Sequence, residues 1–253
     1  MGKFKKVFKK TFLVFFILIP IASFAHYILF PQQTRCILID YSSFKKSGRL
    51  YYNTVTEPSK LDTLNTLIAG ASKRVAAYWG NKISNPKFIY CDKEEDFKYF
   101  GSAYGVPALT HMKGCTYIVL SKQAVDLDII AHELSHAEFY NRIGFYNWTF
   151  KIPRWFDEGL AMQNDYRNYY SEDTLRVKTD NYKTMPDVKS YTSSKQFDEG
   201  GIEKVMLNFM AAKHEVKKWY TKERLENLIR DINAGKSFSE AFFKPVTENQ
   251  PLL

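Results

Sequence analysis

Two histidines spaced four residues apart are the feature of this sequence that points most directly to chemistry. His132, Glu133 and His136 form the pattern H-E-x-x-H, and this spacing puts both imidazoles on one face of a helix. Both rings can then bind one zinc ion. Zinc lowers the pKa of a bound water and polarises a scissile carbonyl, while the glutamate accepts the water proton and passes it to the leaving amine. The pattern therefore predicts peptide-bond hydrolysis with Glu133 as the general base.

A catalytic zinc ion needs a third protein ligand and an open coordination position. Glu158 is the candidate, within the segment W-F-D-E-G-L-A at residues 155–161. Its neighbour Asp157 is an alternative ligand, although adjacent residues of a helix point about 100° apart. We therefore expect one Zn²⁺ ion held by His132, His136 and Glu158.

These two motifs together resemble the gluzincin metallopeptidases and, more broadly, the peptidase-MA-like proteins, over residues 116–165. The resemblance implies a zincin-like fold and zinc ligation by His132, His136 and Glu158. The spacer of 21 residues between His136 and Glu158 is longer than in the aminopeptidase branch, and no G-x-M-E-N segment is present to bind a free amine. Aminopeptidase activity is therefore unsupported, and an endopeptidase is expected.

Other positions depart from the family or fill roles that the resemblance implies. Met162 stands where thermolysin-type members have an aspartate, and Glu138 stands where an apolar residue is usual. Asp165 or Asp157 is expected to orient a ligand histidine. An oxyanion-stabilising residue is also expected, and the candidates are Tyr166, Tyr169, Tyr170, Tyr191 and His214.

The remaining chain predicts an α+β fold in which the zinc site is carried by helices. Strands are expected at 36–40, 50–55, 88–91 and 116–120, and helices at 59–78, 92–101, 126–141, 153–165, 202–214, 222–234 and from Ser237. Loops or irregular chain are expected at 101–114, 143–152 and 166–201. Strand 116–120 is predicted to be the edge strand that pairs with an extended substrate, with an interior strand as the alternative.

The first thirty residues predict a membrane segment. Residues 12–30 are almost wholly apolar and follow five lysines, Lys3, Lys5, Lys6, Lys9 and Lys10. This polarity predicts an anchor with a cytoplasmic N-terminus, and a signal peptide cleaved after Ala25 is the alternative. In either case residues 31–253 form the metallopeptidase domain outside the cytoplasm, as a membrane-anchored or secreted protein. That domain is expected to comprise an α/β part (31–125), the zinc-site helices (126–165) and a helical tail (202–253).

The charge balance argues against a nucleic-acid partner. The formal charge is +9, but without the five leading lysines only 31 basic residues face 27 acidic ones. The three cysteines, without C-x-x-C spacing, exclude a cysteine-rich zinc module. The expected partners are a peptide or protein substrate and, through the N-terminus, a membrane. Two alternatives remain: a non-catalytic, zinc-bound module that binds peptides or proteins, and a metal-free interaction module.

Overall fold

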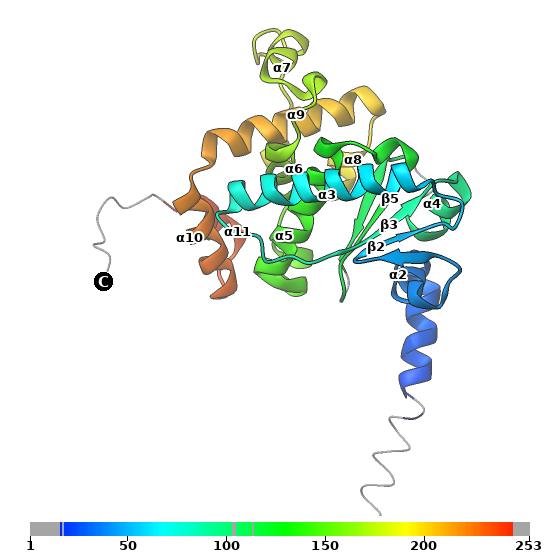
Figure 1. Cartoon of the computed structure of the whole chain (residues 1–253). Coiled ribbons are helices and arrows are strands. Elements are labelled where there is room, and N and C mark those ends of the chain that lie inside the picture. Colours follow the sequence, from blue (N-terminus) through cyan, green and yellow to red (C-terminus); the bar gives the residue numbers. More distant parts are fainter. Residues whose placement is uncertain (1–15, 17, 103–104, 113, 245–253) are drawn as a thin grey trace, which may run out of the picture.

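A computed structural model describes residues 16, 18–102, 105–112 and 114–244 and shows a five-stranded mixed sheet followed by a mostly helical part (Figure 1). The sheet order is β1-β2-β3-β5-β4. The strands are β1 (Lys45–Ser47), β2 (Leu50–Tyr52), β3 (Lys87–Cys91), β4 (Ala108–His111) and β5 (Tyr117–Ser121). The three inner strands run parallel, and β1 and β4 pair antiparallel at the two edges. The predicted α+β class is confirmed.

The prediction that residues 116–120 form the edge strand is wrong. β5 lies between β3 and β4, and Tyr117 to Leu120 are all buried. A continuous apolar run is typical of a strand covered on both faces, which is the arrangement found here. The edge strand is β4, which lies in a segment predicted to be a loop because Gly105, Pro107 and Gly114 flank it.

Both faces of the sheet are covered. On one face of the sheet, Leu50, Phe88 and Ile118 pack with α3 and α5 in the larger core cluster. On the other face, Tyr51, Ile89 and Val119 pack in a second cluster with α2 and α4. These helices are α2 (Pro31–Ile37), α3 (Pro58–Trp79), α4 (Glu94–Phe100) and α5 (Leu127–Phe150). The alternation follows from the period of two in a strand.

Near the N-terminus, the strand predicted at 36–40 is instead the end of α2 followed by the 3₁₀ helix η1 (Ile39–Tyr41). Pro31 at the first helical position favours this start, and Cys36 and Ile39 are buried at helical spacing. Residues 18–29 are also helical and project from the body in Figure 1. Within the described part of the chain, no helix combines the length and apolar character needed to cross a membrane. The lysines and the first residues of the apolar run lie outside the described residues.

The helix predicted at 59–78 is confirmed as α3, which ends at Gly80 with a φ of 81°. The helix predicted at 92–101 is α4, which begins only after Lys93 and has no side-chain cap. α5 continues through most of the segment predicted as an aromatic loop, with a break in the helical backbone at Gly144, where φ is 77°.

The C-terminal half is helical, as expected; α9 is longer than the predicted helix 202–214, whereas α6 is shorter than the predicted helix 153–165. Its helices are α6 (Arg154–Ala161), η3 (Met162–Asn164), η4 (Asn168–Tyr170), α7 (Glu172–Lys178), η5 (Val188–Ser190), α8 (Ser194–Asp198), α9 (Ile202–Trp219), α10 (Lys222–Asn233) and α11 (Phe238–Phe242). The helix predicted from Ser237 is confirmed as α11, and Ser237 and Glu240 form a capping box at its start. Residues 166–201 contain short helices rather than irregular chain alone, and α7 extends beyond α9 at the top of Figure 1.

The structure explains why Glu138 stands where the gluzincin pattern usually has an apolar residue. Its side chain is fully buried and accepts hydrogen bonds from the backbone N–H groups of Ile83 and Ser84 and from Nε of Arg142, at 2.8 to 3.1 Å. A carboxylate on α5 thus fixes the connection between α3 and β3. An apolar residue at this place would leave those donors unpaired.

We expect Glu138→Ala to lower the free energy of unfolding by about 3–5 kcal/mol, because it leaves buried N–H groups and a guanidinium without their acceptor. Urea denaturation of the metal-free protein measures this change. Glu94→Ala is the matched control, since the exposed Glu94 pairs only with Lys98 on the same helix. A Glu138→Ala midpoint equal to that of the parent would contradict this role.

Candidate metal centre

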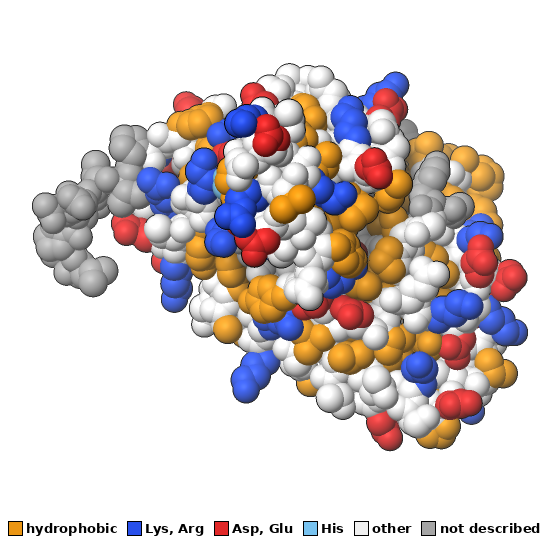
Figure 2. All heavy atoms as spheres, turned by 90° about the horizontal axis from the view of Figure 1, so that it is seen from above, with side chains coloured by type: hydrophobic (Ala, Val, Ile, Leu, Met, Phe, Trp, Pro, Cys, Tyr) orange, Lys and Arg blue, Asp and Glu red, His pale blue; other side chains and the backbone are white. Residues whose placement is uncertain are grey.

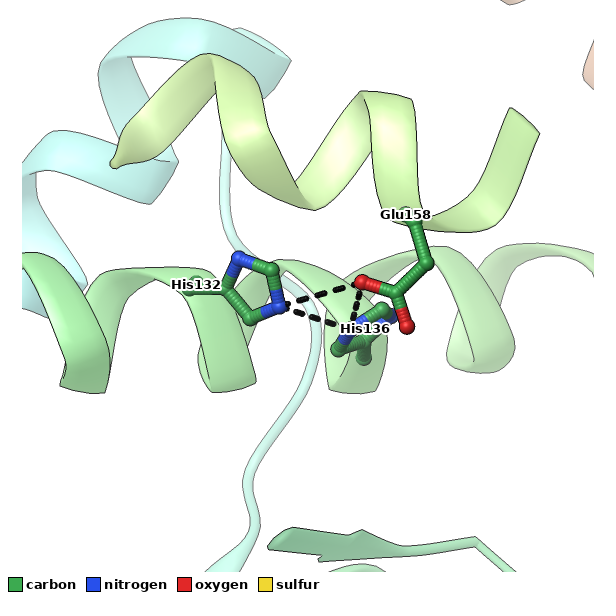
Figure 3. Close-up of side chains that lie close together, drawn as sticks. All are labelled: His132, His136 and Glu158. Atoms are coloured by element: carbon green, nitrogen blue, oxygen red, sulfur yellow. Dashed lines mark hydrogen bonds and ion pairs between the residues drawn. The ribbon is translucent and has the colours of Figure 1, made fainter. Parts of the chain in front are cut away.

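The side chains of the two sequence motifs converge in the structure. His132 and His136 lie one turn apart on α5, and Glu158 comes from α6, which packs against α5. Phe156 positions α6, because its ring contacts those of Phe139 on α5 and Trp219 on α9. Figure 3 shows the three candidate ligands pointing toward one another.

The three donor atoms have the mutual spacing that a single ion requires. Nε2 of His132 lies 3.1 Å from Nε2 of His136, and Oε2 of Glu158 lies 3.3 Å and 3.5 Å from these two nitrogens. Tetrahedral zinc with bonds of about 2.0–2.1 Å separates its ligand atoms by about 3.3–3.4 Å. His136 and Glu158 are buried and His132 nearly so, so the triad could hold one metal ion within the protein.

Asp157 faces the opposite side of the His136 ring. Its Oδ2 lies 3.1 Å from Nδ1 of His136, so Nδ1 carries a proton toward Asp157 and Nε2 faces the triad, where it can bind a metal ion once its own proton has left. Asp157 is therefore placed to orient a ligand, and it lies outside the donor set. Asp165, the other residue expected in this role, is paired with Arg167 instead.

The charges around the triad offset the effect of burial on its ionisation. Burial lowers the pKa of His136, but the carboxylates of Asp157 and Glu158 outweigh it and hold that pKa well above its ordinary value. Burial raises the pKa of Glu158, but Arg154 and His136 outweigh it and hold that pKa well below its ordinary value. Glu158 is therefore ionised at neutral pH, and an arriving metal ion must displace a proton from His136.

Glu133 lies beside the triad and is oriented by the edge strand. Its Oε2 accepts a 2.6 Å hydrogen bond from the hydroxyl of Thr110 on β4, and that hydroxyl also lies 3.2 Å from the backbone oxygen of Glu133. No pattern in the sequence distinguishes Thr110, because its segment is predicted to be a loop. The contact links the sheet directly to the predicted general base.

The triad and Glu133 line a cleft of about 780 Å³. One wall is formed by residues 105–110 and Met112, and the other by the face of α9 that carries Ile202, Val205, Met206 and Phe209. Figure 2 looks onto the side of the molecule that carries α7 and α9, and hydrophobic side chains gather in the middle of that face. The cleft therefore offers apolar walls on both sides of a polar floor.

Two of the five oxyanion candidates reach this cleft, namely Tyr169 and Tyr170. Burial raises the pKa of Tyr170 to about 12, so its hydroxyl stays protonated and can donate a hydrogen bond. Arg167 also lines the cleft, with its guanidinium 5.2 Å and 5.1 Å from the centres of the two tyrosine rings. No pattern in the sequence distinguished this arginine.

The other three candidates are engaged outside the cleft. The ring of Tyr166 lies 4.3 Å from the guanidinium of Arg74. The hydroxyl of Tyr191 donates to the side chain of Asn208. His214 pairs with Glu172. None of these three lines the cleft that contains the triad.

The close packing of α6 against α9 explains why a glycine, Gly159, follows Glu158. A Cβ atom there would lie 2.5 Å from Cγ2 of Val216 and 2.6 Å from the backbone oxygen of Ala212, both on α9. Only glycine therefore allows α9 to approach α6 this closely. The close approach holds Glu158 at its distance from α5.

Comparison with known proteins gives no family. A scan of protein-family models and searches of curated proteins and of solved structures each found no match to this chain. What the structure defines is the class of site: a buried set of two histidines and one glutamate that could hold one metal ion. Such a donor set is consistent with a metal-dependent hydrolase.

Gly159→Ala is expected to destabilise the protein by about 1–3 kcal/mol and to weaken zinc binding, because the added methyl group displaces α6 from α9. Urea denaturation and zinc titration measure the two effects. Gly70→Ala on α3 is the matched control, since its Cβ would meet only the Leu127 side chain, at 3.0 Å. Equal behaviour of the two variants would refute the packing argument.

Zinc at 100 times its dissociation constant is expected to stabilise the protein by about 2.7 kcal/mol, or about 5–10 °C in melting temperature. At one fixed zinc concentration the increase should be larger at pH 8 than at pH 6, because protons compete with the metal for histidine and raise the dissociation constant at the lower pH. Thermal denaturation with and without zinc measures it, and His136→Ala should show no increase. If zinc does not change the melting temperature of the parent protein, this triad is not a zinc site.

Proposed function

We propose that this protein is a zinc-dependent peptidase of the gluzincin type, acting as an endopeptidase on extended peptides. The observation that carries the proposal is the spacing of the His132, His136 and Glu158 donor atoms, which suits one zinc ion, with the carboxylate of Glu133 beside them in the same cleft. A structural zinc site has four protein ligands, whereas a catalytic site has three and an open position.

Zinc bound at this triad would supply a Lewis acid for the scissile carbonyl and for the attacking water. Glu133 then accepts the water proton and delivers it to the leaving amine. The Thr110 hydroxyl donates to Glu133 and so holds the carboxylate in one orientation. When Glu133 carries the proton, the same hydroxyl can donate to the backbone oxygen of that residue instead.

The edge strand β4 is the proposed support for the substrate backbone. It pairs with β5 on one side, and no other described strand pairs with it. Residues 105–110 line the cleft, so a peptide added along β4 would pass the triad. Main-chain pairing of this kind gives affinity with little sequence selectivity.

Hydrogen-bond donors on the opposite side of the cleft are the proposed groups that stabilise the developing oxyanion. Tyr170 is the preferred candidate, because its hydroxyl stays protonated. Burial is the main cause of its raised pKa, the charges of Tyr169, Asp165 and Glu158 add to it, and Arg167 partly offsets it. Tyr169 and Arg167 are the remaining donors that line the same wall.

For location, we propose a membrane-anchored protein with its catalytic domain outside the cytoplasm. The support is the apolar run at residues 12–30 behind five lysines. In the helical part of that run, at 18–29, large apolar side chains are exposed: Leu18, Ile19, Ile21, Phe24, Tyr27, Ile28 and Leu29. Cleavage within this segment would instead give a secreted enzyme.

Peptide-library cleavage tests the proposal. The zinc-loaded full-length chain in detergent should cleave a mixed peptide library, and Glu133→Gln should reduce cleavage by about 10²- to 10⁴-fold while it keeps one zinc ion per chain. Mass spectrometry of the products and metal analysis of both proteins measure the two results. A chelator should abolish cleavage by the parent.

Two other results would each reject the peptidase. If neither protein cleaves although both hold stoichiometric zinc, the protein is a zinc-bound module that binds peptides or proteins. If Glu133→Gln cleaves as fast as the parent, the activity does not use this base.

A further inference from the structure

The two carboxylate oxygens of Glu158 have different partners. Oε2 faces the imidazole nitrogens of His132 and His136, whereas Oε1 lies 2.7 Å from Nη1 of Arg154. Arg154 is the first residue of α6, four positions before Glu158, so the pair spans one turn of the same helix. A guanidinium bound to Oε1 leaves only Oε2 free to coordinate an ion.

Arg154 is itself held in place from a second helix. Its Nε lies 3.5 Å from Oδ2 of Asp198, the last residue of α8. Its side chain is about one-third exposed and lines the cleft, so this ion pair stands at the boundary between the metal centre and solvent. The Glu158 carboxylate that it binds is nearly fully buried, and removal of one partner from a buried pair leaves an uncompensated charge.

We infer that Arg154 is a positioning residue that makes Glu158 a monodentate ligand, through Oε2 alone. Without a partner on Oε1, a carboxylate can turn and chelate a metal ion with both oxygens. That second bond would add to the three donors and the bound water, raise the number of ligands from four to five and crowd the position that a catalytic zinc ion keeps open for substrate. The guanidinium also withdraws electron density from the carboxylate, which leaves a bound ion more electrophilic.

This inference rests on the metal centre of the proposed function but not on peptidase activity, so coordination can be measured directly. Cobalt(II) bound in place of zinc reports the number of ligands at the site. The visible absorption of cobalt(II) weakens as that number rises from four to five. The variants are Arg154→Met, which keeps the aliphatic stem, and Arg154→Lys, which keeps a cation able to bind Oε1. Arg176→Met is the matched control, since Arg176 is exposed on α7 and its ion pair among the described residues is with Asp173 on the same helix.

We expect the full-length parent, Arg154→Lys and Arg176→Met to show the intense four-coordinate spectrum. Arg154→Met should lose that intensity several-fold and bind zinc more tightly, because a second oxygen bonds to the ion and the guanidinium no longer competes for the carboxylate. Competition with a chromophoric chelator measures the zinc affinity. If Arg154→Met does not fold, Arg154→Gln takes its place with the same expectation. A folded Arg154→Met with the spectrum and zinc affinity of the parent would overturn the inference.

The outcomes separate this inference from the proposed function. A parent that binds no cobalt would remove the metal centre and both proposals with it. A parent that binds cobalt but cleaves no peptide would reject the peptidase alone, and the spectra of the Arg154 variants would still decide how Glu158 coordinates.

Discussion

The burial of the Glu158 carboxylate between α5 and α6 is the constraint on which the rest of the site depends. A buried carboxylate is costly unless charged or polar groups surround both oxygens. Here one oxygen pairs with Arg154 and the other faces two imidazole nitrogens. The same short helix also provides Asp157, which fixes the ring of His136. α6 thus contributes one donor atom and orients a second.

Packing against the C-terminal helices positions α6, because a helix of eight residues has little stability of its own. Trp155 and Phe156 pack edge-on against rings of α9 and α11, among them Trp219 and Phe242. Gly159 lets α9 approach within van der Waals distance. The described part of the tail, up to Lys244, supplies no donor atom to the triad, yet it sets the distance between Glu158 and the histidines.

The sheet reaches the site through α5 and β4. Glu138 ties α5 to the chain entering β3, and Thr110 on β4 bonds to Glu133 one helical turn earlier. The residue that would move protons is therefore held by the same strand that would hold the substrate. This arrangement gives a physical reason for an edge strand beside the metal helix.

The sequence by itself determined the features that depend on local spacing. The H-E-x-x-H pattern on a helix, α3 with its stop at Gly80, and Glu158 as the carboxylate that joins the two histidines in one possible metal site all follow from helical periodicity or motif. Tertiary structure decided which strand is the edge, that Asp157 rather than Asp165 reaches His136, and which tyrosines reach the cleft. The physical reason is that strand order and side-chain partners depend on contacts between distant segments, which local pattern does not encode.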